Sequence, residues 1–213
     1  MGTRVTLVTQ ARATRTRTGV ERHRMDTELA VGFGYKCGWI AVPVVDGAQV
    51  LAALPVEGAL APTTFARGLE LALSSRDRAG PYFVTPPIDG WTLIVAASMP
   101  EPVVGEPSRS WLEALSARLG VDCYWFANHR VSDYYGWAYA ERGKVTRVHV
   151  RCQGDVRSNE GPASATERSY GYRAQGYWSV NEELVLTLAS EWSVDPRELD
   201  GRDLGRGWLV QLG

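Results

Sequence analysis

The sequence predicts an α+β domain, in which two or three helices pack on one face of an antiparallel or mixed β-sheet. Short runs rich in Val, Ile, Tyr and Trp recur between Gly, Pro and Asp residues, as is typical of strands. Helix-length segments with apolar residues on one face alternate with these runs. Three of the strand-like runs follow one another through short links, which favours an antiparallel meander over residues 121–152. We expect about five to seven strands in one sheet.

The strand-like runs are short and apolar, and residues that favour turns bound each of them. They occupy residues 36–45, 49–54, 82–84, 91–98, 121–128, 134–140 and 145–152. Asp46-Gly47 predicts a tight turn between the first two runs, and Arg142-Gly143 predicts another between the last two. The C-terminal run 205–212 is a further strand candidate, which either joins the edge of this sheet or pairs with another chain.

Capping residues ahead of one-sided apolar stripes indicate where helices begin. Ser110-x-x-Glu113 has the form of a capping box for a helix over 111–119, and Gly120 stands where a C-terminal cap is expected. The other expected starts are Thr63 or Thr64 for a helix that runs to Ser74, Ser179 for a helix with Leu184, Leu188 and Trp192 on one face, and Asp195 for a short final turn.

Residues 25–213 are expected to form a single domain, with residues 1–24 outside it as a basic, unstructured tail or a mis-assigned start. Residues 1–24 hold six Arg and one Glu, a net charge of +5, and the whole chain carries −1, so residues 25–213 carry −6. Strand–helix–strand patterns over 36–84 and 90–128 suggest an internal duplication, with chance as the alternative. The Gly-, Ser- and Arg-rich stretch 153–178 is expected to be a long loop with one turn after Ser164-x-x-Glu167.

Composition argues against several classes of protein. The acidic body disfavours nucleic-acid binding, which needs cations to neutralise phosphates. No apolar run approaches the roughly 18 residues of a membrane span. Cys37, Cys123 and Cys152 form no C-x-x-C pair, which argues against a disulfide framework or zinc ribbon and favours a reducing cytoplasm. The three histidines are too dispersed for a metal motif and no phosphate-binding loop is present, so we expect no metal and no cofactor. The excess of 21 Arg over 2 Lys indicates a high-GC bacterial source.

Seven of the chain's 21 aromatic rings lie between Tyr124 and Tyr139. Strand alternation places several of these rings on one face of the sheet and small residues on the other. Arg and His side chains of the next strand point to the same face as the rings. Because a helix-covered sheet does not need large rings on both faces, we expect the excess to form an open ligand wall. The alternative is that the 153–178 loop or a second subunit covers them. The expected ligand-binding residues are Tyr124, Phe126, Tyr135, Trp137 and Tyr139 for the wall, and His129, Arg147 and Arg151 for the charge partner.

The link between the first two strands of the meander concentrates groups that can carry chemistry. His129 with Asp133 would form an oriented base, and Ser132 or Cys123 would be the nucleophile. The signal is weak, because no nucleophile elbow surrounds Ser132 and Cys123 points into a strand. An ordinary polar loop is the alternative interpretation.

These observations predict a non-enzymatic, cytoplasmic binding protein that holds a peptide or a small aromatic or anionic ligand, accessory to bacterial peptide or natural-product maturation. One alternative is a small hydrolase or transferase that uses His129 and Asp133. A second is an acidic interaction protein that neutralises a basic toxin. The expected partners are a peptide or small molecule and, through the C-terminal strand, a second copy in a homodimer.

Overall fold

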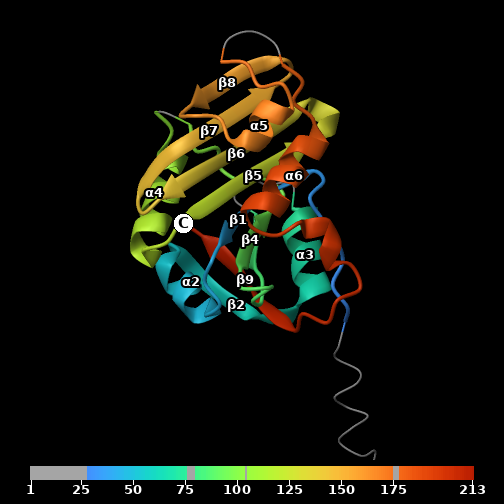
Figure 1. The fold of residues 1–213 in the computed structure, drawn as a ribbon. Coiled ribbons are helices and arrows are strands. Elements are labelled where there is room, and N and C mark those ends of the chain that lie inside the picture. The colour runs from blue at the N-terminus through green and yellow to red at the C-terminus, as the bar shows by residue number, and fades with distance from the viewer. Residues whose placement is uncertain (1–27, 76–79, 104, 175–177) are drawn as a thin grey trace, which may run out of the picture.

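The computed structural model describes residues 28–75, 80–103, 105–174 and 178–213, and the expectation for residues 1–24 lies outside them. The described residues form one nine-stranded sheet with the order β2-β9-β3-β4-β1-β5-β6-β7-β8, in which every neighbouring pair is antiparallel (Figure 1). The strands are β1 (Cys37–Val42), β2 (Val56–Thr64), β3 (Tyr82–Val84), β4 (Thr92–Ala96), β5 (Cys123–His129), β6 (Tyr134–Glu141), β7 (Lys144–Cys152), β8 (Asp155–Glu160) and β9 (Arg206–Leu212).

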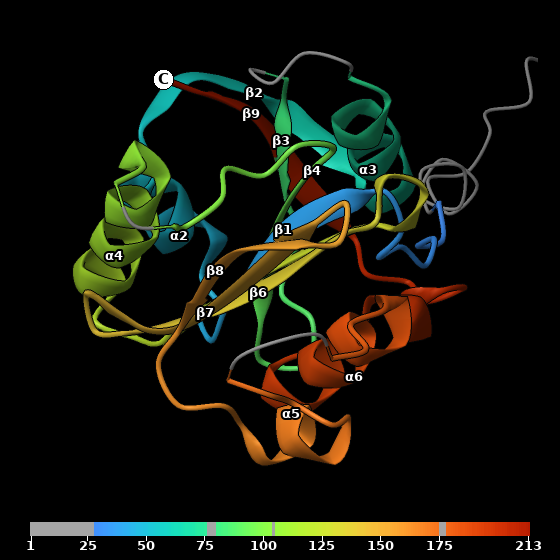
Figure 2. The same cartoon turned by 90° about the horizontal axis from the view of Figure 1, so that it is seen from above.

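Helices cover both faces of this sheet, as Figure 2 shows from above. One face packs against α2 (Gly47–Ala53) and α4 (Pro107–Leu119). The other packs against α3 (Phe65–Ser74) and α6 (Glu182–Trp192), with the short α5 (Ala165–Ser169) beside α6. Two 3-10 turns, η1 (Arg130–Ser132) and η2 (Pro196–Leu199), complete the described elements.

The α+β class is confirmed, and of the two predicted arrangements, antiparallel or mixed, the sheet has the antiparallel one. The predicted five to seven strands and single helical layer are wrong. The described residues contain nine strands and five α-helices. Two separate apolar clusters explain the second layer. Ile40 and Trp125 point to the α4 side, and their chain neighbours Trp39 and Phe126 point to the α6 side. A sheet that is apolar on both faces must be covered on both.

The meander of β5, β6 and β7 is confirmed. In the hairpin between β6 and β7, Arg142 and Gly143 have φ values of 43° and 98°, the left-handed conformation that a tight two-residue turn requires. Opposite the rings of β6, Gly136 lies against the Trp125 indole. The small residues of β6 therefore make room for a large ring on the α4 side.

Helix capping explains one of the wrong strand predictions. Residues 49–54 lie largely in α2 and form no strand, because the Asp46 side chain accepts a hydrogen bond from the Ala48 amide at 2.9 Å and caps a helix. The predicted strand list also lacked β2 and β8. Residues 153–178 are thus not one long loop, since they contain β8 and α5.

Helix starts were predicted with mixed success. Thr64 caps α3, the Ser164 and Glu167 pair forms a complete capping box for α5, and Asp195 caps η2. In contrast, α4 begins at Pro107 rather than after Ser110, since proline fits the first turn of a helix. Asn181 rather than Ser179 caps α6. Gly120 ends α4 in the left-handed conformation, as predicted.

The C-terminal strand β9 lies inside the sheet, paired with β2 on one side and β3 on the other. Both of its hydrogen-bonding edges are therefore used within its own domain. The stretches considered as duplicates also differ: 36–84 contains three strands and two helices, and 90–128 contains two strands and one helix. No described helix has the length and apolarity needed to cross a membrane.

Candidate functional site

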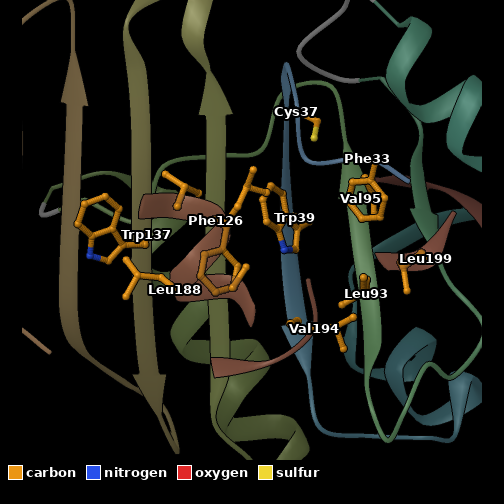
Figure 3. Packing of buried hydrophobic residues seen from close by; sticks show 14 of the residues in the cluster. Phe33, Cys37, Trp39, Leu93, Val95, Phe126, Trp137, Leu188, Val194 and Leu199 are labelled. Carbon is orange, nitrogen blue, oxygen red and sulfur yellow. The ribbon is translucent and has the colours of Figure 1, made fainter. Parts of the chain in front are cut away.

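Part of the predicted open wall of rings is buried in the hydrophobic core. Phe126 and Trp137 have no exposed surface and Tyr135 is 8% exposed. Trp192 of α6 packs on Phe126 with ring centroids 6.0 Å apart, and Trp178 packs edge-on to Trp137 at 5.9 Å. Figure 3 shows Phe126 and Trp137 side by side with Leu188 of α6 among them. These two rings cannot contact a ligand, because α6 and the segment before it cover them.

Arg147 is the cation of a buried ion pair and is not a free charge partner. It is 3% exposed, and its guanidinium binds the Glu167 carboxylate through Nε at 3.0 and 3.2 Å and through a further Nη2 contact. Its Nη1 donates to Asn159 Oδ1 at 2.9 Å, and the guanidinium lies 5.4 Å above the Tyr172 ring. The donors of Arg147 are thus directed at groups of its own chain.

Glu167 ties α5 to the sheet. It also accepts a hydrogen bond from Trp137 Nε1 at 3.0 Å and from the Ser164 amide at 2.8 Å, and it has no exposed surface. Burial raises the pKa of this carboxyl, but the hydrogen bonds from Arg147 and Ser164 outweigh it and hold the pKa below its usual range. The sequence contained one signal for this packing of α5 on the sheet, the Ser164-x-x-Glu167 capping box.

His149 is buried beside the same residues, against Trp137 and Trp178. Its ring stacks on Trp137 at 4.6 Å, and its Nδ1 lies 3.3 Å from Asn159 Oδ1. Asn159 Oδ1 accepts, so Nδ1 carries the proton and Nε2 is left as a buried acceptor without a partner among the described residues. Burial lowers the pKa of His149 to about 4. Protonation at Nε2 would place a second cation close to Arg147. The new Nε2–H would have no acceptor among the described residues.

His129 and Asp133 do not form the predicted dyad. His129 Nε2 lies 3.1 Å from the Ala97 carbonyl oxygen, and Asp133 accepts a hydrogen bond from Arg151 at 3.2 Å. Arg151 is 7% exposed, so it too serves the chain's own packing. Cys123 is buried, and burial raises the pKa of its thiol to about 12, which removes it as a nucleophile at neutral pH.

Four half-buried rings remain accessible at the opposite end of β5 and β6. We call Trp91, Tyr124, Tyr139 and Trp192 the ring cluster. Tyr124 lies at its centre: it stacks on Tyr139 at 5.1 Å with an interplanar angle of 2°, and meets Trp91 at 5.7 Å and Trp192 at 6.0 Å. Two members, Tyr124 and Tyr139, were predicted ligand-binding residues, whereas the two tryptophans were missed because they come from segments distant in sequence.

The charges beside the ring cluster are negative. Burial raises the pKa of Tyr124, and the carboxylates of Asp122 and Glu141 raise it further. The pKa of Tyr139 is raised for the same reasons, and its hydroxyl donates to Glu141 Oε1 at 2.5 Å. Neither Asp122 nor Glu141 forms an ion pair with a cation among the described residues. The predicted aromatic–cationic surface is thus aromatic and anionic where it is accessible.

Comparison with known proteins found no matching family model, no similar curated protein and no similar solved structure. Among the described residues, no group of three or more His, Cys, Asp or Glu side chains is placed to hold a metal ion. The function must therefore be argued from the geometry of the ring cluster and its carboxylates.

Proposed function

We propose that the protein is a non-enzymatic binding protein whose ring cluster holds a cationic side chain of a peptide or protein partner. The observation that supports this most is the conjunction of four half-buried rings with two carboxylates, Asp122 and Glu141, that have no cationic partner among the described residues. The faces of Trp and Tyr rings carry negative potential, and they attract Arg or Lys by roughly 0.5–2 kcal/mol. A carboxylate beside the ring adds direct charge pairing.

The net charge of the chain favours the same kind of partner. Residues 1–27 hold six Arg and two acidic residues, a net of +4, and the total is −1, so residues 28–213 carry −5. An acidic body attracts a basic partner over distances of about a Debye length, near 8 Å at physiological salt. The expected acidic interaction protein and the expected peptide-binding protein thus become one proposal.

An anionic ligand is disfavoured, because the two arginines meant to hold it are themselves buried and pair with carboxylates of their own chain. Arg147 is paired with Glu167 and Arg151 with Asp133. A hydrolase based on His129 and Asp133 is disfavoured for a similar reason, because both side chains bind other groups. We therefore propose binding rather than hydrolysis.

The test is isothermal titration of the protein with two blocked pentapeptides, one containing two arginines among glycines and one containing two glutamates. We expect the arginine peptide to bind, to change tryptophan emission and to weaken as salt is raised. Tyr124→Leu and Glu141→Gln should each weaken it by about fivefold, which corresponds to about 1 kcal/mol.

The matched controls are Tyr170→Leu, which removes a half-buried tyrosine of the α5 region, and Glu198→Gln, which removes an exposed carboxylate of η2. Both should bind the arginine peptide as the unmodified protein does. Equal affinity for the two peptides, or equal losses in the control and test variants, would show that the ring cluster is not a cation site.

A further inference from the structure

The segment that follows β8 lies across the sheet and is attached to it by one buried side chain. Residues 161–174, which we call the strap, contain α5, and Figure 1 shows α5 over β6 and β7. The structure describes every residue of the strap, and Glu167 is the one that is buried. A helix as short as α5 is not stable by itself. The strap therefore stays closed through its contacts with the rest of the fold.

The contacts between the strap and the sheet are polar and converge on Arg147. Glu167 accepts hydrogen bonds from Arg147 Nε at 3.0 Å and from Trp137 Nε1 at 3.0 Å. The Tyr172 ring lies 5.4 Å from the Arg147 guanidinium carbon, and its hydroxyl accepts from Asn159 Nδ2 at 3.4 Å. The strength of contacts like these depends on the charges around them.

The strap has weaker contacts with α6. Tyr170 Oη lies 3.2 Å from Thr187 Oγ1, and the Thr166 hydroxyl donates to Glu191. Tyr170 is half-buried, and Thr166 and Glu191 lie at the surface. Hydroxyl contacts at a surface contribute little net stability, so the buried carboxylate of Glu167 is the main attachment of the strap.

His149 shares its hydrogen-bond acceptor with the cation that holds the strap. Asn159 Oδ1 lies 3.3 Å from His149 Nδ1 and accepts from Arg147 Nη1 at 2.9 Å. The imidazole has no exposed surface and packs against Trp137 and Trp178, with ring centroids 4.6 and 5.2 Å away. A change in the charge of His149 therefore acts directly on the groups to which the strap is attached.

A proton on His149 Nε2 is costly only while the strap is closed. Nε2 then has no acceptor among the described residues, whereas an open strap would admit water, which accepts from Nε2–H. Burial lowers the pKa of His149 to about 4, with Arg147 and Arg151 acting in the same direction and Asn159 and Glu167 against it. The side chains that β6, β8 and the segment before α6 place against the ring are uncharged.

We propose that protonation of His149 releases the strap from the sheet while the rest of the fold stays intact. The open imidazole takes up its proton near pH 6.5 and the closed one near pH 4, so opening becomes more favourable as the pH falls through this range. The pKa of Glu167 is held below its usual value in the closed strap, so its protonation favours opening only at lower pH. Acid would thus uncover His149 and Arg147. This inference does not depend on the proposed function.

Hydrogen exchange of the full chain at pH 7, 6 and 5, followed by mass spectrometry, tests the proposal. The amides of Arg168, Tyr170 and Tyr172 donate to carbonyls within the strap and report its opening. Their rates are divided by those of His149→Phe at the same pH, which removes the intrinsic pH dependence of exchange. We expect this ratio to rise about twentyfold from pH 7 to pH 5, given pKa values of about 4 in the closed strap and 6.5 in the open one.

Urea below the unfolding transition distinguishes local opening from global unfolding. Exchange through a local opening exposes little surface and should hardly change in 1 M urea, whereas exchange through global unfolding rises steeply. Amides of α4, on the opposite face, should exchange more slowly than those of the strap at every pH. A ratio that stays constant between pH 7 and pH 5, or strap exchange that rises with urea as α4 exchange does, would overturn the proposal.

A second variant tests the attachment without altering the imidazole. Glu167→Gln removes the charge that pairs with Arg147, so strap exchange at pH 7 should rise by about tenfold and stay insensitive to urea. Glu198→Gln, which removes an exposed carboxylate of η2, should leave strap exchange unchanged. Equal strap exchange in these two variants would show that Glu167 does not hold the strap, and the proposal would be wrong.

Discussion

Acidification from pH 7 to pH 4 should destabilise the fold through a single buried imidazole, that of His149. Its pKa is lowered from 6.5 to about 4, first by burial and then by the neighbouring Arg147 and Arg151 cations, against the opposing effects of Asn159 and Glu167. The unfolded chain takes up a proton near pH 6.5, whereas the folded chain takes it up only near pH 4. Between these values the unfolded state binds more protons, so stability falls as the pH falls.

The size of this effect follows from the shift. The difference between 6.5 and 4 corresponds to at most about 3 kcal/mol at 1.36 kcal/mol for each pKa unit. By the same linkage, about 2 kcal/mol is already lost between pH 7 and pH 5. This is a large part of the stability of an ordinary domain, which is roughly 5–15 kcal/mol.

The assay is urea unfolding followed by tryptophan fluorescence at a series of pH values from 7 to 4. The control is His149→Phe, which retains a ring to stack on Trp137 but cannot titrate. Carboxylates and His129 titrate in both proteins, so the difference between the two curves isolates His149. The reasoning is refuted if the unmodified protein and His149→Phe lose the same free energy between pH 7 and pH 5.

Three further outcomes follow from the packing. Glu167→Ala should destabilise the fold by about 3–5 kcal/mol in urea unfolding, because it leaves Arg147 buried without its carboxylate; a loss below about 1 kcal/mol would contradict this account. Gly136→Ala should lower the melting temperature, at a cost of about 1–3 kcal/mol, because the added carbon would lie 2.6 Å from the Trp125 ring; an unchanged melting temperature would show that the ring moves freely. The Cys123 thiol, with a pKa of about 12 and no exposed surface, should resist alkylation at pH 8 until the chain unfolds. Mass spectrometry of labelled peptides checks this, and alkylation of Cys123 in the folded protein would contradict it.

The sequence allowed the local parts of the fold to be predicted. Alternation and a two-residue turn were sufficient for the meander, because both depend on neighbouring residues. The caps at Thr64 and Asp195 were identified for the same reason. The insertion of β9 between β2 and β3 was not predictable, because it pairs strands more than a hundred residues apart, and no local pattern specifies such a partner.

The candidate site was predicted in part, and the error has one physical origin. The excess of rings on the meander was real, but Trp178 and Trp192 arrive from distant segments and cover Phe126 and Trp137. Strand alternation gives the face on which a ring lies and says nothing about what packs against that face. Of the predicted wall residues, Tyr124 near the start of β5 and Tyr139 near the end of β6 are left with both ring neighbours and open surface.

Covering a sheet face that carries arginines also determines the charge of the surface that stays open. A buried guanidinium requires a carboxylate, so the cover of this face had to bring Glu167 to Arg147, while Asp133 from the adjoining turn pairs with Arg151. The positive charge is thereby neutralised inside. The carboxylates at the rim, Asp122 among them, lie beside accessible rings and have no cationic partner in the part of the chain that the structure describes. The inversion from an expected anion site to a proposed cation site is thus a consequence of burial, and it explains why the same aromatic residues support both interpretations.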